Sequence, residues 1–320
     1  MIEIISVSGQ ALIVGAQRER VASMGITAAG ASDQTAFNLA NRLCSNDANS
    51  AGIEILFGSL SFIAHKTCFI AVTGAMSDIH KDHTAVAMNR TVQLDAGSRV
   101  DIACPTLGMR AYLAVSEGFD VPAIFGSPTT SQREKLGGVD SVGSLLKAGD
   151  KLPLSAQVGS VRRLYRMPLH EESLTSTSLT SAPITLRVVE GFQAHEFSPV
   201  SRATFYASTY TVTPDANRMG VRLQGAQIGW DKRGLVSEGI TRGAVQIPPN
   251  GQPIVMMAEY QTIGGYPKLG SVFSHDVDKL AQCRPGDLVV FSPISIENAH
   301  NLLNLRAFAQ RNIHLLPIPE

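Results

Sequence analysis

Short apolar runs, separated by Gly, Pro and Asp, dominate the hydrophobic pattern of the chain. Runs of about four to eight apolar residues between turn-forming residues are typical of β-strands. Residues 94–100, 146–152 and 284–291 repeat one arrangement, a glycine turn followed by an apolar-rich strand. This repetition predicts a mainly β protein with duplicated barrel-like lobes, although a β-sandwich fits the same periodicity.

Helical periodicity is confined to a few segments. Residues 33–46 follow Ser32, a candidate N-cap, and carry apolar residues on one face. Residues 277–281 show the same spacing before Pro285, and a last helix with several leucines is expected to begin near Ser295. The first two are the only interior helices that the pattern predicts clearly.

The sharpest change in composition marks a boundary between two lobes. Residues 173–181 read SLTSTSLTS, a tract with few groups that can pack in a core. The sequence therefore predicts an N-terminal β-barrel lobe over residues 1–165, a linker or loop over 166–183, a C-terminal lobe over 184–294, and a helix with a tail over 295–320.

Charge and composition exclude several classes of protein. The chain has 320 residues, with 27 Lys plus Arg and 27 Asp plus Glu, so no net field favours nucleic acid or an anionic membrane. The N-terminus has no basic segment before its apolar run, and no stretch approaches the ~18 apolar residues of a membrane-spanning helix. We expect a cytoplasmic protein.

Cysteine and histidine positions do not favour a metal site. The four cysteines are widely spaced and form no C-x-x-C pair, as expected of reduced core residues. His80 and His83 in HKDH, with His65 as a third ligand, could bind a metal in principle. Histidines beside Lys and Asp between strands usually lie in a solvated turn, so no metal is predicted.

Residues 250–270, NGQPIVMMAEYQTIGGYPKLG, are the most informative segment. An apolar run over 254–258 predicts a buried strand that ends in a polar loop. Gly264 and Gly265 free the backbone there, so that main-chain N–H groups can converge on a ligand, and Lys268 adds a positive charge. This loop suits a small anion.

Several polar residues have both a structural and a functional interpretation. Asn217 and Arg218 either close a surface turn or present a guanidinium fork to a carboxylate or phosphate. Glu238 and Glu259 are either solvated or ion-paired carboxylates, or general acid and base groups if they are partly buried. The amides near the glycines either satisfy buried backbone groups or recognise an amide or ureido group, and they are Gln246, Asn250, Gln252 and Gln261.

The same segment, with other blocks, resembles a known family. Residues 217–225 (NRMGVRLQG) and 237–253 (SEGITRGAVQIPPNGQP) precede it, and the N-terminal half contributes 25–43 (GITAAGASDQTAFNLANRL) and 108–138. In this order the blocks resemble the biotin-dependent carboxyltransferase, or allophanate hydrolase subunit 2, family, which includes KipA and the C component of 5-oxoprolinase. The resemblance covers roughly residues 5 to 300 and is more specific for family than for activity.

The resemblance implies two cyclophilin-like β-barrel lobes and a role in a multi-component enzyme. The expected activity is that of the C component of an ATP-dependent 5-oxoprolinase, which opens 5-oxoproline to L-glutamate together with a KipI-like B component and an A component. The expected catalytic residues are Glu238, Glu259, Gln261 and Thr262. The expected substrate-binding residues are Asn217, Arg218, Gln246, Asn250, Gln252, Gly264, Gly265, Tyr266 and Lys268, with Gly30 and Asp33 from the N-terminal half.

The chain departs from the family pattern at a few positions. Gly15 stands where the family has an Asp in its N-terminal turn, and Ser32 stands where it has Met. Ile263 replaces the second Thr of a Gln-Thr-Thr-Gly-Gly motif. A preserved site with altered detail is expected.

Two alternatives remain for the function. The chain contains neither an ATP-grasp domain nor the Ala-Met-Lys-Met setting of a biotinylated lysine, so it cannot carboxylate alone. It could still be a carboxyltransferase component that acts on urea or a similar amide with carboxybiotin from another chain. It could also be a KipA-like protein that binds a KipI-like regulator without catalysis.

Overall fold

The chain folds into two compact units in the computed structural model. The described residues are 1–155, 165–166, 182–230, 235–312 and 315–317, so the Ser/Thr tract over 173–181 lies outside them. Residues 29–155 and 1–19 fall in the first unit, together with the short segments 165–166 and 315–317. The second unit contains 182–230 and 235–312, and residues 20–28 group with it as well.

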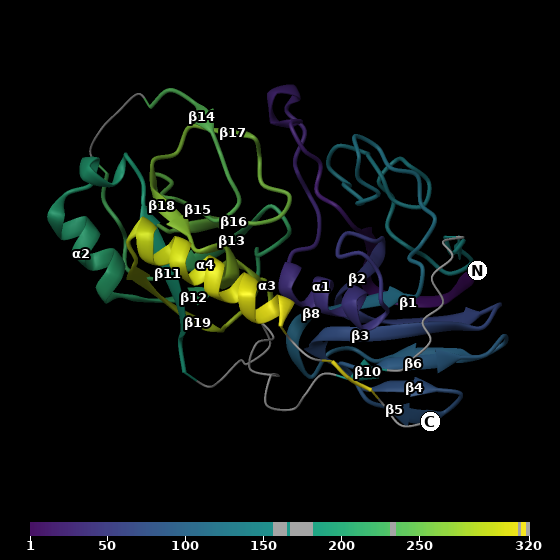
Figure 1. The fold of residues 1–320 in the computed structure, drawn as a ribbon. Helices are drawn as coiled ribbons and strands as arrows, with labels where there is room; N and C mark the ends of the chain where they lie inside the picture. Colours follow the sequence, from purple (N-terminus) through teal and green to yellow (C-terminus); the bar gives the residue numbers. More distant parts are fainter. Residues whose placement is uncertain (156–164, 167–181, 231–234, 313–314, 318–320) are drawn as a thin grey trace. The chain divides into compact units, whose positions relative to one another are not determined.

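The first unit is built on a nine-stranded sheet (Figure 1). Seven strands follow the order β5-β4-β7-β2-β8-β3-β6, while β1 pairs with β2 and with β9. The long antiparallel pair of β1 and β2 contains two register shifts, which indicate bulges that help a sheet to curve. The strands are β1 (Ile2–Val14), β2 (Gly52–Ala64), β3 (Cys68–Met76), β4 (Ile79–Lys81), β5 (Thr84–Val86), β6 (Thr91–Leu94), β7 (Arg99–Ile102), β8 (Leu107–Val115) and β9 (Lys151–Leu152). A separate pair joins β10 (Tyr165–Arg166) to β20 (Leu316–Pro317).

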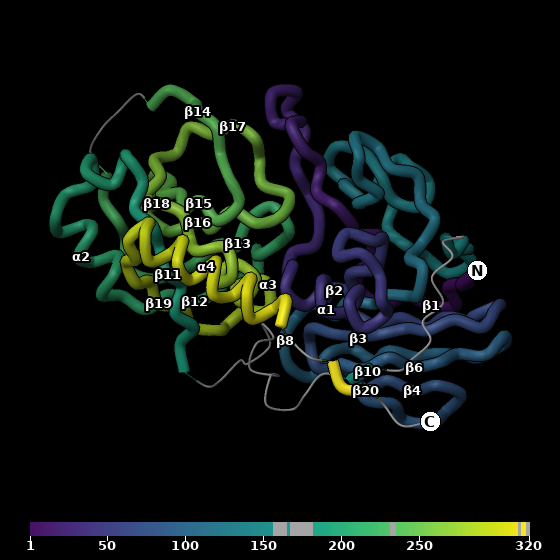
Figure 2. Tube along the Cα trace, viewed as in Figure 1, coloured from purple at the N-terminus to yellow at the C-terminus, as the bar shows by residue number. Residues whose placement is uncertain are grey.

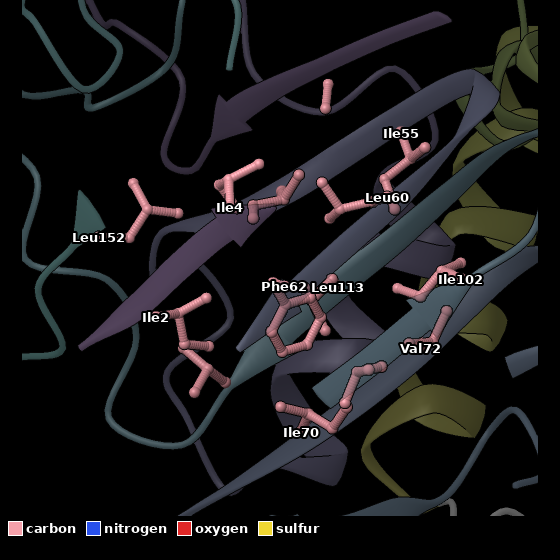
Figure 3. Packing of buried hydrophobic residues seen from close by; sticks show 14 of the residues in the cluster. Ile2, Ile4, Ile55, Leu60, Phe62, Ile70, Val72, Ile102, Leu113 and Leu152 are labelled. Carbon is pink, nitrogen blue, oxygen red and sulfur yellow. The ribbon is translucent and has the colours of Figure 1, made fainter. Parts of the chain in front are cut away.

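Alternating side chains of these strands form the first hydrophobic core. Phe62 of β2 is fully buried and lies among aliphatic side chains of the neighbouring strands, as Figure 3 shows. Ile2 and Ile4 contribute from β1, and Leu113 contributes from β8. One face of the curved sheet therefore packs against this core, because successive side chains of a strand point to opposite faces.

Helix α1 (Gln34–Leu43) corrects one detail of the sequence prediction. Its N-cap is Asp33, whose Oδ1 accepts a hydrogen bond from the Ala36 N–H at 2.9 Å, and not Ser32. The Ser32 N–H and hydroxyl instead donate to the buried carboxylate of Glu54, and Tyr112 donates to the same carboxylate at 2.9 Å. Burial and Glu54 hold the pKa of Tyr112 well above its usual range, so this hydroxyl keeps its proton.

The second unit contains a closed barrel with the strand order β11-β18-β15-β16-β13-β12-β19. A parallel pairing of β11 with β19 closes the ring, and all the other pairs are antiparallel. The strands are β11 (Ile184–Glu190), β12 (Thr209–Val212), β13 (Gly220–Gln224), β15 (Ala244–Gln246), β16 (Ile254–Met256), β18 (Lys268–Val272) and β19 (Leu288–Pro293). The mainly β prediction with two barrel-like sheets is confirmed, and closure of this ring excludes the sandwich alternative for the second unit.

Three α-helices lie in the described part of the second unit. Helix α3 (Ser274–Ala281) and helix α4 (Ile296–Arg311), whose N-cap is Ser295, confirm the sequence prediction. Helix α2 (Pro199–Ala207) was not predicted, although Ser198 as N-cap and a proline in the first turn are its ordinary start signals. Its one fully buried side chain, Phe205, stacks on Phe291 of β19 with ring centroids 4.3 Å apart. No described helix has the length and apolar character to span a membrane.

The predicted glycine turns occur as expected. Gly97, Gly149 and Gly286 precede β7, β9 and β19 and all have positive φ, from 89° to 96°. A Cβ at any of the three would meet no atom within 4 Å, so the backbone conformation, not space, requires glycine there.

Buried charges attach α3 to the barrel. Asp276 accepts three hydrogen bonds from Arg187 of β11, two from the guanidinium at 2.7 Å and one from the backbone N–H at 3.0 Å. Burial opposes ionisation of Asp276, but these bonds outweigh it and hold the pKa of Asp276 below its usual value. On the same helix Asp278 pairs with Arg242 at 2.7 Å.

The adjacent His275 predicts a loss of stability in mild acid. Burial and the nearby Arg306 lower the pKa of His275 to about 4, while Asp278 and Asp276 oppose this effect and Lys279 adds to it. Between about pH 6.5 and pH 4, His275 therefore binds a proton in the unfolded chain but not in the folded chain. This difference lowers the free energy of unfolding by up to ~3 kcal/mol as the pH falls.

Urea unfolding at pH 7.5 and pH 5 checks this expectation. From pH 7.5 to pH 5, the urea concentration at the unfolding midpoint should fall less for His275→Gln than for the wild type. The control variant His300→Gln, which changes an exposed histidine, should show the same fall as the wild type. Equal losses for both variants would contradict the role of His275. The lowered pKa of Asp276 makes stability depend on pH only below its ordinary pKa of 3.8, so Asp276 does not contribute to the change between pH 7.5 and pH 5.

Candidate functional site

A short ribbon outside the barrel carries part of the predicted site. Strands β14 (Glu238–Gly239) and β17 (Ile263–Gly264) pair only with each other, and Glu238 lies opposite Gly264. Figure 2 shows the two segments running side by side, separate from the barrel strands. The glycine loop of the sequence therefore meets a carboxylate that lies 26 positions earlier in the chain.

Glu238, Lys268 and Gln193 form a connected polar group. Lys268 Nζ, at the start of β18, lies 2.6 Å from Glu238 Oε1. The Gln193 amide, which follows β11, donates from Nε2 to the same Glu238 oxygen and accepts the Lys268 backbone N–H through Oε1 at 2.7 Å. Because Gln193 is buried and both ends of its amide are engaged, it fixes the position of the carboxylate and the start of β18.

Two further amides converge on Gly264. A Cβ built on Gly264 would lie 2.9 Å from Nε2 of Gln246 and 2.9 Å from Nε2 of Gln261, and 3.0 Å from Ile240. Gln246 Nε2 is buried and has no hydrogen-bond partner among the residues that the structure describes. Burying an amide N–H without a partner is costly, so this donor is poised for a ligand or water.

We call this group the Lys268 cluster, and it consists of Gln193, Glu238, Gln246, Gln261, Gly264 and Lys268. Thr262 and Gly265 adjoin it along the chain, and the Thr262 carbonyl accepts from Ile240 at 3.0 Å. The cluster offers an ammonium, an oriented carboxylate and two amide donors. Such a set can bind a small molecule with a carbonyl and an amide or carboxylate group.

Exposed apolar side chains adjoin the Lys268 cluster in sequence. Phe192 is 69% exposed and precedes Gln193, and Val236 is 82% exposed two positions before Glu238. Ile263, beside Gly264, is 59% exposed, and Tyr266 is 41% exposed. Exposed apolar side chains that form one contiguous patch mark a surface that another protein covers, whereas single ones are common on any protein.

Arg218 and Glu259 pair with each other. Arg218 Nε donates to Glu259 Oε1 at 2.8 Å, and both side chains are less than 10% exposed. The Arg218 carbonyl also accepts the Glu259 N–H at 2.7 Å. The anion-binding role of Arg218 and the acid or base role of Glu259 stay predictions, and the pair favours a supporting role for both.

Three other predicted residues lie apart from the Lys268 cluster. Asn217 is exposed and accepts the N–H of Met219 at 2.8 Å, which is the surface-turn interpretation. Asn250 and Gln252 line a hollow of about 590 Å³ to which no member of the Lys268 cluster contributes. The structure thus divides the predicted amide set into two places.

The two N-terminal candidates belong to the first unit. Asp33 is fully buried as the cap of α1. Gly30 has a φ of 93°, and a Cβ there would lie 2.7 Å from the side chain of Gln17. Gly15 stands where the family has an Asp. A Cβ built at Gly15 would lie only 2.6 Å from Pro128 Cγ, so a larger residue would not fit without movement.

The histidines considered for metal binding lie on hairpins. His80 is an exposed residue of β4, and His83, with a φ of 68°, lies in the turn before β5. His65 bonds Glu3 at 2.7 Å. Within the described ranges, no group of three or more His, Cys, Asp or Glu side chains is placed to hold a metal ion.

Gln193 was missed by the sequence analysis because it lies in GFQAHEF, a segment without turn, motif or periodic signal. Its position beside Lys268 follows from the barrel, since β11 and β18 are hydrogen-bonded neighbours. Only the pairing of strands more than seventy positions apart reveals it.

The crowding at Gly264 yields a matched test with Gly265. Gly264→Ala should push the two amides apart and destabilise the protein by ~1–3 kcal/mol through overpacking. Gly265→Ala should cost little, because its Cβ would meet nothing closer than Ser237 at 3.3 Å. Urea unfolding of both variants measures the difference, and equal unfolding free energies would show that the amides do not hold their positions tightly.

Comparison with known protein families identifies the chain's relatives. The model of the family described as "Carboxyltransferase domain, subdomain A and B" matches residues 24–293. The chain is 35% identical to the C component of the 5-oxoprolinase of Escherichia coli K12, over 93% of both chains. It is 31% identical to the C component of the Haemophilus influenzae 5-oxoprolinase, over 94% of both. The urea amidolyase of Saccharomyces cerevisiae is 28% identical over 87% of this chain, which spans only 16% of that protein.

Solved structures show the same fold in larger proteins. The Kluyveromyces lactis urea amidolyase matches all of this chain with a TM-score of 0.89 at 23% identity, over 21% of its own length. The K. lactis urea carboxylase matches 99% of the chain with a TM-score of 0.88 at 24% identity, over 30% of its own length. These likenesses establish the fold.

Proposed function

The chain belongs to the carboxyltransferase domain family, subdomains A and B, and on this basis we propose that it is the C component of an ATP-dependent 5-oxoprolinase. Two relatives with that name match almost the whole chain at 35% and 31% identity. The observation that carries the proposal is the Lys268 cluster, in which an ammonium, a carboxylate and amides surround a glycine loop. The substrate would be 5-oxoproline and the product L-glutamate.

Lactam opening needs positive charge at the carbonyl oxygen, where negative charge develops in the transition state. The Lys268 ammonium has three N–H donors and lies 2.6 Å from the Glu238 carboxylate as an ion pair, but it makes no hydrogen bond among the described residues. Its donors can bind the carbonyl oxygen while the ion pair with Glu238 keeps the ammonium in position. Gln246 and Gln261 would hold the lactam amide and the ring carboxylate, with Thr262 and the Gly264–Gly265 backbone beside them.

The apolar residues near the cluster support a site that a second polypeptide completes. Phe192, Val236 and Ile263 project into solvent in this chain, and their burial would favour association by ~25 cal/mol for each Å² removed from water. The partner we propose is a KipI-like B component, and an A component would complete the enzyme. ATP would act in that complex, and the isolated chain would be inactive.

Lys268→Met in the reconstituted complex tests the chemistry. We expect kcat for 5-oxoproline-dependent ATP hydrolysis to fall ~100-fold or more, the usual effect of removing one transition-state donor. Lys147→Met, which removes an exposed lysine in the first unit, is the matched control and should leave the rate unchanged. An unaltered kcat/KM for Lys268→Met would remove this lysine from the mechanism.

Size-exclusion chromatography of the chain with the B component tests the partner surface. The wild-type pair should elute as one complex at micromolar concentration, and Ile263→Asp should disrupt it. Helix α4 offers a second exposed apolar surface, since Leu305 is 65% and Phe308 is 69% exposed, so Leu305→Asp is the comparison. Disruption by Leu305→Asp alone would move the interface to α4, and two unshifted wild-type peaks would argue against the complex.

A carboxyltransferase acting on urea or a similar amide is the second candidate. The S. cerevisiae urea amidolyase relative favours it, and paired amide donors suit a ureido group as well as a lactam. A biotinylated partner in the purified complex, with no ATP hydrolysis dependent on 5-oxoproline, would select this function. A stable complex with neither activity would select a KipA-like binding protein.

A further inference from the structure

The hollow of about 590 Å³ in the second unit is a second concave site, distinct from the Lys268 cluster. We call it the Arg222 hollow. Strand β13, the turn before it and the β15–β16 loop enclose it, and its lining includes Thr213, Asp215, Arg222, Gln224, Gln227 and Asn250. Its volume is within the usual range for small-molecule sites.

Strand alternation explains why the hollow is polar. Val221 and Leu223 of β13 point into the barrel core, so Arg222 and Gln224 point outward on the same face. Gln252 builds the adjoining wall, because its amide accepts the Gly225 N–H at 2.7 Å and donates to the Gly225 carbonyl at 3.2 Å. These two bonds fix that wall, and they use one of the two N–H groups and one of the two lone pairs of the amide.

Of the other polar side chains of the hollow, Asn250 accepts the Gln252 N–H at 3.1 Å, and the remaining ones have no described partner. Among the residues that the structure describes, the side chains of Arg222, Gln224 and Gln227 have no hydrogen bond or ion pair. The carboxylate of Asp215 also has no partner there, so it does not pair with Arg222 although both line the hollow. The Thr213 hydroxyl is buried and unsatisfied within the same described part of the chain. A cation, an anion and amides therefore face one concavity without satisfying one another.

We propose that the Arg222 hollow binds a free α-amino acid. The Arg222 fork suits its carboxylate, Asp215 suits its ammonium, and Gln224 and Gln227 suit a polar side chain with donor and acceptor groups. The ligand needs both a negative and a positive group. A ligand with only negative charge would be repelled by Asp215, and a ligand with only positive charge would be repelled by Arg222. The volume leaves room for a side chain as large as that of glutamate. This site does not depend on the proposed reaction.

Isothermal titration calorimetry of the isolated chain tests the proposal, with L-glutamate as the probe and glutarate, which lacks the ammonium, as its analogue. L-Glutamate should bind more tightly than glutarate. Arg222→Gln should weaken L-glutamate binding about tenfold or more, the loss expected for one charge-assisted contact. Asp215→Asn should weaken L-glutamate but not glutarate.

Two control variants locate the binding. Arg133→Gln and Lys147→Met each remove an exposed cation of the first unit, so both should bind L-glutamate as the wild type does. No binding of L-glutamate up to ~10 mM would overturn the proposal. Equal affinity for L-glutamate in Arg222→Gln and the wild type would also overturn it.

Discussion

Closure of the second barrel through β11 is the constraint on which the rest of that unit depends. This strand pairs with β18 on one side and, in parallel, with β19 on the other. Arg187 of β11 also donates hydrogen bonds to the buried Asp276 of α3. The strand that closes the barrel therefore also holds this helix. A buried carboxylate with three hydrogen bonds is stable only while all its donors stay in place, because a lost partner leaves a charge uncompensated.

The same strand positions the candidate site. The chain leaves β11 at Glu190 and reaches Gln193, whose amide joins the start of β18 to the β14–β17 ribbon. Lys268 and Glu238 thus come from a barrel strand and from a ribbon outside it, and a buried amide holds them in register. Part of the site is rigid because the barrel is closed, whereas the ribbon is held by two residue pairs and side-chain contacts.

Charge is used differently in three parts of the second unit. Arg187 and Arg218 are neutralised by buried carboxylates and stabilise the fold. Lys268 is only partly engaged, so its ammonium can serve both Glu238 and a substrate oxygen. Arg222 lies on the outer face of β13 with no described partner, which makes it available to a ligand. In the sequence these four residues are simply basic side chains, and only their surroundings in the structure distinguish the stabilising roles from the ligand-binding ones.

The sequence by itself determined the mainly β class, the helices within residues 33–46, around 277–281 and after Ser295, the three glycine turns and the family. Periodicity, caps and motif order are local properties of the chain. The sequence also selected Glu238, Gln246, Gln261, Gly264 and Lys268 as candidates. Only the tertiary structure decided that Glu238 and Lys268 meet at Gln193 and that Gln246 and Gln261 meet at Gly264. It also decided that Asn250 and Gln252 line another hollow and that Arg218 pairs with Glu259. Ring closure and the pairing of distant strands fix such neighbours, and no local pattern in the chain records which strands will pair.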